Sequence, residues 1–166
     1  MSIPFRGRTG DSTYFITAST WQKRSLFQTD PMAALLLDVL LHYRAAGKYR
    51  LHEFVIMPTH FHLLLTSAGE ATLERAVQFI KGGFSHRAGK ELQFKGSVWQ
   101  TSFYDRRVRD PEEYQRMRDY ILQNPVRRGL VQAAEQWPYS SARPRLELDE
   151  VPRRLKPDAS VARMQA

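Results

Sequence analysis

The sequence of 166 residues contains no cysteine, which excludes disulfide bonds and zinc sites built from thiolates. It also lacks an apolar run long enough to span a membrane, and its first residues lack the apolar core of a signal peptide. We therefore expect a soluble, cytoplasmic protein with no membrane partner. The length suits one compact domain and is too short for two comfortable ones.

Acidic residues are in the minority, because 17 Asp and Glu stand against 25 Lys and Arg, a formal net charge of +8. Such a balance favours a polyanionic partner, since basic side chains that contact phosphates release counterions. A basic surface that only keeps the protein soluble is the plainer interpretation. The basic residues form small local clusters along the chain and no basic tail dominates.

The apolar pattern predicts the order strand, helix, strand, strand, helix, strand, helix. The expected strands cover residues 13–19, 49–57, 60–66 and 98–108, and the expected helices cover 30–46, 72–88 and a third segment that starts at Asp110-Pro111. Gly82-Gly83 predicts a bend or a close backbone approach in the second helix, and Pro125 is expected to end the third. This order fits an α+β fold in which helices pack against one face of an antiparallel sheet.

Two histidines, His60 and His62, flank one apolar residue at the start of an expected central strand. Residues two apart on a strand share a face, so both imidazoles can converge on one metal ion while Phe61 enters the core. The third helix carries a nucleophile, Tyr120, and an oxygen ligand, Asn124, four positions apart on one helix face. The joint occurrence of these residues therefore favours a metal-assisted reaction of a tyrosine.

Each of these residues alone has a plainer interpretation. A histidine pair on a strand is more often a structural feature, and a tyrosine on a helix more often packs in a core. Tyr114, on the same expected helix, is the competing nucleophile. Four positions after it stands Arg118, which cannot ligate a metal, so the sequence favours Tyr120.

Several blocks of this sequence resemble one known family. His60-Phe61-His62 looks like the HUH motif, and residues 120–131 are similar to the catalytic-tyrosine segment of single-tyrosine transposases, specifically the REP-associated branch. Blocks at 99–108 and 137–141 are also similar to that branch, so the resemblance covers roughly 12–143. It implies a ferredoxin-related, palm-like HUH endonuclease fold for a domain at 1–143. Residues 144–166 combine prolines and mixed charges with few large apolar groups, which predicts a flexible basic tail.

The resemblance implies a transposase that nicks and rejoins single-stranded DNA at hairpin-forming palindromes through a 5′-phosphotyrosine. Tyr120 is the expected nucleophile, and Mg²⁺ or Mn²⁺ held by His60, His62 and Asn124 would polarise the scissile phosphate. The resemblance leaves open whether the protein acts as a monomer or as a homodimer.

Contacts to unpaired DNA require stacking surfaces and cations. The aromatic candidates, Trp99, Phe103 and Tyr104, fit core packing as well as stacking. The basic candidates fit a solvated surface as well as phosphate contacts, and they are Lys81, Arg106, Arg107, Arg109, Arg127 and Arg128. For the general base that accepts the phenolic proton, the sequence offers His52, His86 or a metal-bound water.

The same residues leave three other functions to consider. A domesticated relative would bind hairpin DNA as a regulator, but retention of both histidines and the tyrosine argues against loss of chemistry. A histidine-triad nucleotide hydrolase needs a third histidine two positions after His62, where this chain has Leu64. A zinc hydrolase needs a further His or Asp close in sequence, and none is present.

Overall fold

The computed structural model describes residues 12–68, 71–144 and 146–157. Its centre is a four-stranded antiparallel sheet in the order β2-β3-β1-β4, made of β1 (Thr13–Ser19), β2 (Tyr49–Met57), β3 (His60–Ser67) and β4 (Tyr104–Val108). The helices are α1 (Asp30–Ala45), α2 (Leu73–Glu91) and α3 (Pro111–Arg127), with short 3-10 turns η1 (Trp21–Lys23), η2 (Leu26–Gln28), η3 (Ala134–Gln136) and η4 (Arg153–Leu155). None of the described helices is long and apolar enough to cross a membrane.

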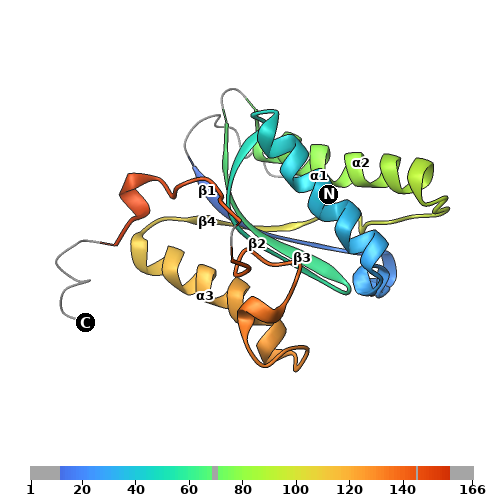
Figure 1. Ribbon diagram of the computed structural model, residues 1–166. Helices are drawn as coiled ribbons and strands as arrows, with labels where there is room; N and C mark the ends of the chain where they lie inside the picture. Colours follow the sequence, from blue (N-terminus) through green and yellow to red (C-terminus); the bar gives the residue numbers. More distant parts are fainter. Residues whose placement is uncertain (1–11, 69–70, 145, 158–166) are drawn as a thin grey trace.

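Helices cover both faces of the sheet, with α1 and α2 on one face and α3 on the other (Figure 1). Successive side chains of a strand point to opposite faces, so Ile16 and Phe61 pack toward α1 and α2 while Phe15 and Leu64 pack toward α3. The α+β class is confirmed, but the expectation that helices cover one face is wrong. The apolar run of β3 is buried almost throughout, as expected for a strand that is covered on both sides.

The first three strands lie where the apolar pattern predicts them, and Pro58-Thr59 forms the tight turn between β2 and β3. The fourth strand was predicted from residue 98, and this prediction is wrong because β4 begins only at Tyr104. Before that point a single bridge joins Trp99 to Thr20. The indole of Trp99 packs among core side chains, so the chain leaves the regular sheet there.

The third helix does not end at Pro125, as the sequence predicted, but continues to Arg127. Its start is confirmed, since the side chain of Asp110 caps the helix by accepting a hydrogen bond from the backbone N–H of Glu113 at 2.8 Å. Its end is set by Gly129, whose φ of +71° is a conformation that glycine adopts freely.

Helices α1 and α2 approach closely at Gly83. A Cβ atom built on this glycine would lie 2.6 Å from Cε2 of the Tyr43 ring, which is closer than real Cβ contacts allow. The close backbone approach predicted at Gly82-Gly83 is therefore confirmed at Gly83, whereas a Cβ on Gly82 would meet nothing within 4 Å. The helix itself continues through both glycines.

The segment after α3 runs along the outer edge of β2. Tyr139 O accepts a hydrogen bond from the backbone N–H of Ile56 at 2.8 Å, and Asp149 N donates to Leu51 O at 2.9 Å. Leu155 is fully buried in the core on the α3 side of the sheet. The expected flexible tail from residue 144 is therefore wrong for residues 146–157, while 158–166 lie outside the described residues.

Candidate active site

A solvent-open hollow of about 260 Å³ lies at the end of the sheet where β2 turns into β3. Its walls come from β1, the loop after β1, the β2–β3 turn, β3 and α3. The lining residues are Thr17, Ser19, Lys23, Thr59, His60, His62, Tyr120 and Arg128. The hollow thus unites four residues named from the sequence with four that the sequence analysis missed.

The two histidines are adjacent in the hollow, with ring centroids 4.7 Å apart. A threonine hydroxyl lies at hydrogen-bond distance from Nδ1 of each ring, Thr17 at 2.7 Å from His62 and Thr59 at 2.9 Å from His60. Nε2 of His62 is buried and has no hydrogen-bond partner among the described residues. With Nδ1 engaged by a hydroxyl, the second ring nitrogen is the one available to a ligand.

Both imidazoles are uncharged near neutral pH. Burial, together with the charges of His60 and Arg128, lowers the pKa of His62 to about 3. Burial also lowers the pKa of His60 to about 4, with the charges of Arg128 and Lys23 acting in the same direction. A neutral imidazole is the form that ligates a metal, so the electrostatics suit a pair of ligands.

Tyr120 of α3 reaches over this pair. Its ring centroid is 5.3 Å from that of His62 and 5.9 Å from that of Phe15, and the Arg127 guanidinium lies 5.4 Å from its centroid. The side chain is 37% exposed, so the phenol can meet a substrate. Tyr114, the competing nucleophile, is 6% exposed in the core on the α3 side, which favours Tyr120.

Asn124 lies one helical turn after Tyr120 and one turn before Arg128, both of which line the hollow. Its side chain is buried, and its Oδ1 has no hydrogen-bond partner among the described residues. The sequence placed this amide at a frayed helix end, and that expectation is wrong because α3 continues past it.

A divalent cation would fit this donor set. Two buried polar atoms without partners, His62 Nε2 and Asn124 Oδ1, belong to residues of the expected site, and buried polar atoms normally find partners. The described residues contain no cluster of three His, Cys, Asp or Glu side chains that could hold a metal. The fit therefore depends on the asparagine as third ligand beside His60 and His62.

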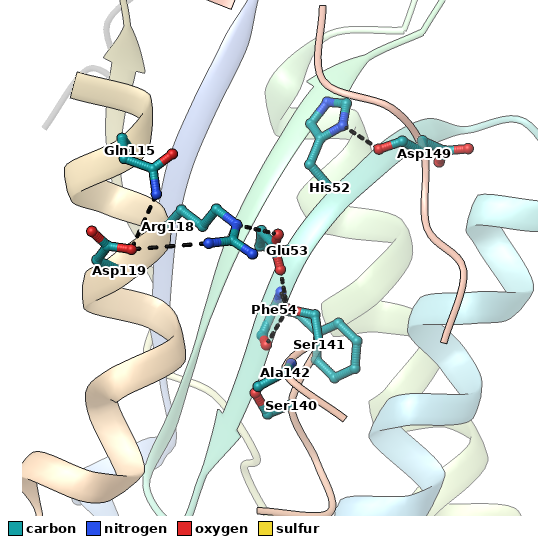
Figure 2. A network of polar contacts seen from close by, with 10 residues as sticks. All are labelled: His52, Glu53, Phe54, Gln115, Arg118, Asp119, Ser140, Ser141, Ala142 and Asp149. Atoms are coloured by element: carbon teal, nitrogen blue, oxygen red, sulfur yellow. Dashed lines mark hydrogen bonds and ion pairs between the residues drawn. The ribbon is translucent and has the colours of Figure 1, made fainter. Parts of the chain in front are cut away.

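A polar network fixes α3 against the sheet (Figure 2). The Arg118 guanidinium donates to Glu53 of β2 at 3.0 Å, and the Ser141 hydroxyl lies 2.5 Å from the other oxygen of the same carboxylate. Arg118 stands two residues before Tyr120 on α3. The network therefore ties the helix that carries the tyrosine both to β2 and to the segment that covers the edge of β2.

A second hollow of about 300 Å³ continues from the first and shares Thr17 and Ser19 with it. Tyr104 lines it and is 57% exposed. Arg106 points to the same face of β4 as Tyr104, where it pairs with Glu113 at 2.6 Å. The two hollows together make a polar path across β1.

The other basic candidates of this region are distributed differently. Arg107 is opposite Tyr14 in the sheet, so it points to the α1 and α2 face. Arg109 is exposed just before α3. Of the basic residues named from the sequence, Arg128 lines the first hollow, and the Arg127 guanidinium lies over the ring of Tyr120.

Two sequence candidates are engaged inside the protein. Trp99 packs its ring against Phe61 and Phe84, and its indole N–H donates to Lys81 O at 2.9 Å. The Lys81 ammonium donates to Gln100 O at 2.8 Å, and burial lowers its pKa. Both side chains are half-buried, and these internal bonds hold the segment that lines the second hollow.

Neither histidine named as a general base reaches Tyr120. His52 is buried between Thr66 Oγ1 at 2.7 Å and Asp149 O at 2.9 Å, with its ring near Tyr114. His86 lines a hollow of about 640 Å³ between α1 and α2, on the opposite face of the sheet. That larger hollow holds none of the residues that converge on Tyr120.

The lining residues that were not predicted differ in how strong a sequence signal they carry. Thr59 directly precedes His60 in the sequence, and strand alternation places Thr17 on the face opposite to the apolar Ile16, so both have a local signal. Lys23 follows no motif, because only the path of the loop after β1 brings it to the hollow.

Comparison with known proteins shows the family and the fold of this chain. Residues 9–124 match the family model described as "Transposase IS200 like". The REP-associated tyrosine transposase of Escherichia coli (strain K12) is 26% identical over 130 residues, covering 78% of this chain and 75% of the relative. A solved REP-associated tyrosine transposase bound to a REP hairpin has the same fold, with a TM-score of 0.71, 23% identity and 96% of each chain covered. These matches confirm the resemblance inferred from the sequence blocks.

Proposed function

Because this chain belongs to the IS200-like transposase family, whose members cut and rejoin DNA, we propose that it nicks and rejoins hairpin-forming single-stranded DNA through Tyr120. The observation that carries the proposal is the contact of Tyr120 with His62, at 5.3 Å between ring centroids, above a hollow with two cations. The DNA hairpin in the solved relative supports this class of substrate.

In the proposed reaction, Tyr120 Oη attacks the scissile phosphorus in line. An O–P bond to the tyrosine forms, and the bond from phosphorus to the 3′-oxygen breaks. The phenolic proton is lost, and the departing 3′-oxygen takes up a proton, which leaves a 5′-phosphotyrosine and a free 3′-hydroxyl. The reverse attack by another 3′-hydroxyl rejoins the strand and frees the tyrosine.

Mg²⁺ or Mn²⁺ bound by His60, His62 and Asn124 would neutralise charge that develops on the scissile phosphate. The unpartnered Nε2 of His62 and Oδ1 of Asn124 support this set. The protein's own contribution is to keep both imidazoles neutral by burial. Tyr120 is held over them by its contacts with Phe15 and Arg127.

The strand would enter along the second hollow and meet the first at β1. There Tyr104 offers an exposed ring for stacking an unpaired base, and Arg106 offers a cation on the same face. Arg127 and Arg128 would hold phosphates next to the tyrosine. Arg107 and Arg109 are proposed as outer contacts for the hairpin, whereas the internal hydrogen bonds of Lys81 and Trp99 argue against DNA contacts by these two side chains.

The tyrosine is proposed to act in its own subunit. Tyr120 already meets His62 of the same chain, so the arrangement needs no helix exchange with a second copy. The polar network at Arg118 and Glu53 supports this, because it ties α3 to its own sheet.

The test uses 5′- and 3′-labelled hairpin DNA from the flanks of the gene, with Mn²⁺ or Mg²⁺, and detects a covalent protein–DNA adduct on denaturing gels. Wild type is expected to form the adduct, and Tyr120→Phe and His62→Ala are expected to form none. Tyr114→Phe is the matched control, since its ring is buried away from the hollow, and it should retain the adduct. Hairpin binding without an adduct in either metal would overturn the nicking mechanism and favour a DNA-binding regulator.

A further inference from the structure

The loop after β1 brings a lysine to the hollow by an unusual backbone path. Gln22 and Lys23 both have positive φ, at +56° and +51°, and they are consecutive. Residues with a Cβ rarely adopt this left-handed conformation, and a run of two is rarer than a single one. Neither is glycine, the residue that would adopt it freely. Backbone strain of this kind is typical of ligand-binding segments, where the surrounding structure maintains it.

The base of the loop is fixed by several independent bonds. Thr20 is fully buried, its backbone N–H donates to Thr59 O at 2.9 Å, and its hydroxyl lies 2.7 Å from Arg24 O. Trp21 N donates to Val98 O at 2.8 Å. The loop is therefore tied to the β2–β3 turn and to the segment before β4, and these ties hold the left-handed residues in place.

The position of Lys23 follows from these ties. The exposed side chain lines the hollow together with His60, His62 and Tyr120. Arg128 lines the same hollow from α3, so two cations come from separate elements. Among the described residues that line it, none is acidic.

The lining of the hollow suits an anion, because Lys23 and Arg128 both line it beside His60 and His62. Two cations beside neutral imidazoles and three hydroxyls, those of Thr17, Ser19 and Thr59, make a favourable environment for a phosphodiester group.

We propose that Lys23 is a phosphate-binding residue of the active site, and that the left-handed turn at Gln22 and Lys23 serves to place its ammonium opposite Arg128 across the DNA phosphate. The inference rests on the proposed function, since it names a contact to the same substrate. It assigns to the loop after β1 a part in substrate binding that no motif of the sequence marks.

The test compares Lys23→Gln with Lys23→Arg and with Lys90→Gln, an equal loss of charge at an exposed position near the end of α2. The probe is a labelled single-stranded hairpin from the gene flanks, titrated by fluorescence anisotropy across a salt series. For Lys23→Gln we expect about tenfold weaker binding and a slope of log affinity against log salt that is smaller by about 0.7. Lys23→Arg should restore both, and Lys90→Gln should match wild type.

Adduct formation by the same proteins separates this inference from the proposed function. An adduct in wild type that forms about tenfold more slowly in Lys23→Gln at subsaturating DNA would support both. Wild-type binding and salt slope in Lys23→Gln would overturn the role of Lys23, whatever the adduct shows. Absence of the adduct from wild type would overturn the nicking mechanism, while the salt slope would still decide whether Lys23 binds phosphate.

Discussion

The hydroxyl of Thr17 is expected to control the chemistry of His62 through a single hydrogen bond. Its Oγ1 lies 2.7 Å from Nδ1, and the ring is 4% exposed, so solvent cannot replace the partner. For Nε2 to offer a lone pair to the hollow, Nδ1 must carry the proton and donate it to Thr17. Thr17→Val keeps the shape of the side chain and removes the acceptor.

The expected size of the effect follows from burial. A buried polar group left without its partner costs about 1–3 kcal/mol, which corresponds to a shift of roughly 5- to 150-fold between tautomers. Loss of an outer partner of a ligating histidine typically weakens metal affinity or activity by about 10- to 100-fold. We therefore expect Thr17→Val to form the DNA adduct about 10- to 100-fold more slowly than wild type.

The measurement combines a spectrum and a rate. Long-range ¹H–¹⁵N spectra of the metal-free protein should report the Nδ1–H tautomer of His62 in wild type and in Thr17→Ser, and its loss in Thr17→Val. Thr13→Val is the matched control, because it removes a buried hydroxyl bond of 2.7 Å to Thr66 from the same strand and face. It should lower stability and leave the adduct rate unchanged. A Thr17→Val protein with the wild-type tautomer and adduct rate would refute the reasoning.

Three further predictions concern stability in urea. Gly83→Ala should lower the free energy of unfolding by about 1–3 kcal/mol, because its Cβ would meet the Tyr43 ring at 2.6 Å. Adding Tyr43→Ala to the same protein should recover part of that stability. Leu155→Ala should lower the free energy of unfolding by about 2–5 kcal/mol, because Leu155 is fully buried. A change near zero would mean that residues 146–157 do not pack on the domain. Burial lowers the pKa of His52, so the unfolded chain binds a proton at a higher pH than the folded protein does. The free energy of unfolding should therefore fall as the pH drops below about 6.5. His52→Gln should make this fall less steep.

Local patterns were sufficient for much of the fold and for the centre of the site. The alternation that places His60 and His62 on one face of β3 needs only the geometry of a strand, and Phe61 enters the core as that geometry requires. The helix start at Asp110 is likewise a short-range signal. Tyr120 was preferred to Tyr114 because Asn124 stands four positions after it, whereas Arg118 follows Tyr114. The burial of Tyr114 favours the same choice.

Contacts between distant parts of the chain were not accessible in the same way. The ion pair of Glu53 with Arg118 joins residues 65 positions apart, and no periodicity marks either partner. Leu155 ends the three-residue 3-10 turn η4, which is too short to show a periodic apolar pattern that would predict its burial. Trp99 was a stacking candidate by residue type alone, and only the fold decides whether an aromatic ring packs inward.

The end of α3 shows how one local rule failed and why the failure matters for the site. Pro125 has no N–H to donate to Ile121 O, and it disfavours helical geometry at Asn124, so the sequence predicted a stop. The missing hydrogen bond costs little near the end of a helix, because only the last turn follows Pro125. Beyond the turn at Gly129, Leu130 N donates to Pro125 O at 2.9 Å. Because α3 continues for two residues past Pro125, with Arg128 as its C-cap, Arg128 lies on the face of α3 that carries Tyr120 and Asn124. A helix that stopped at the proline would leave the hollow without its second cation.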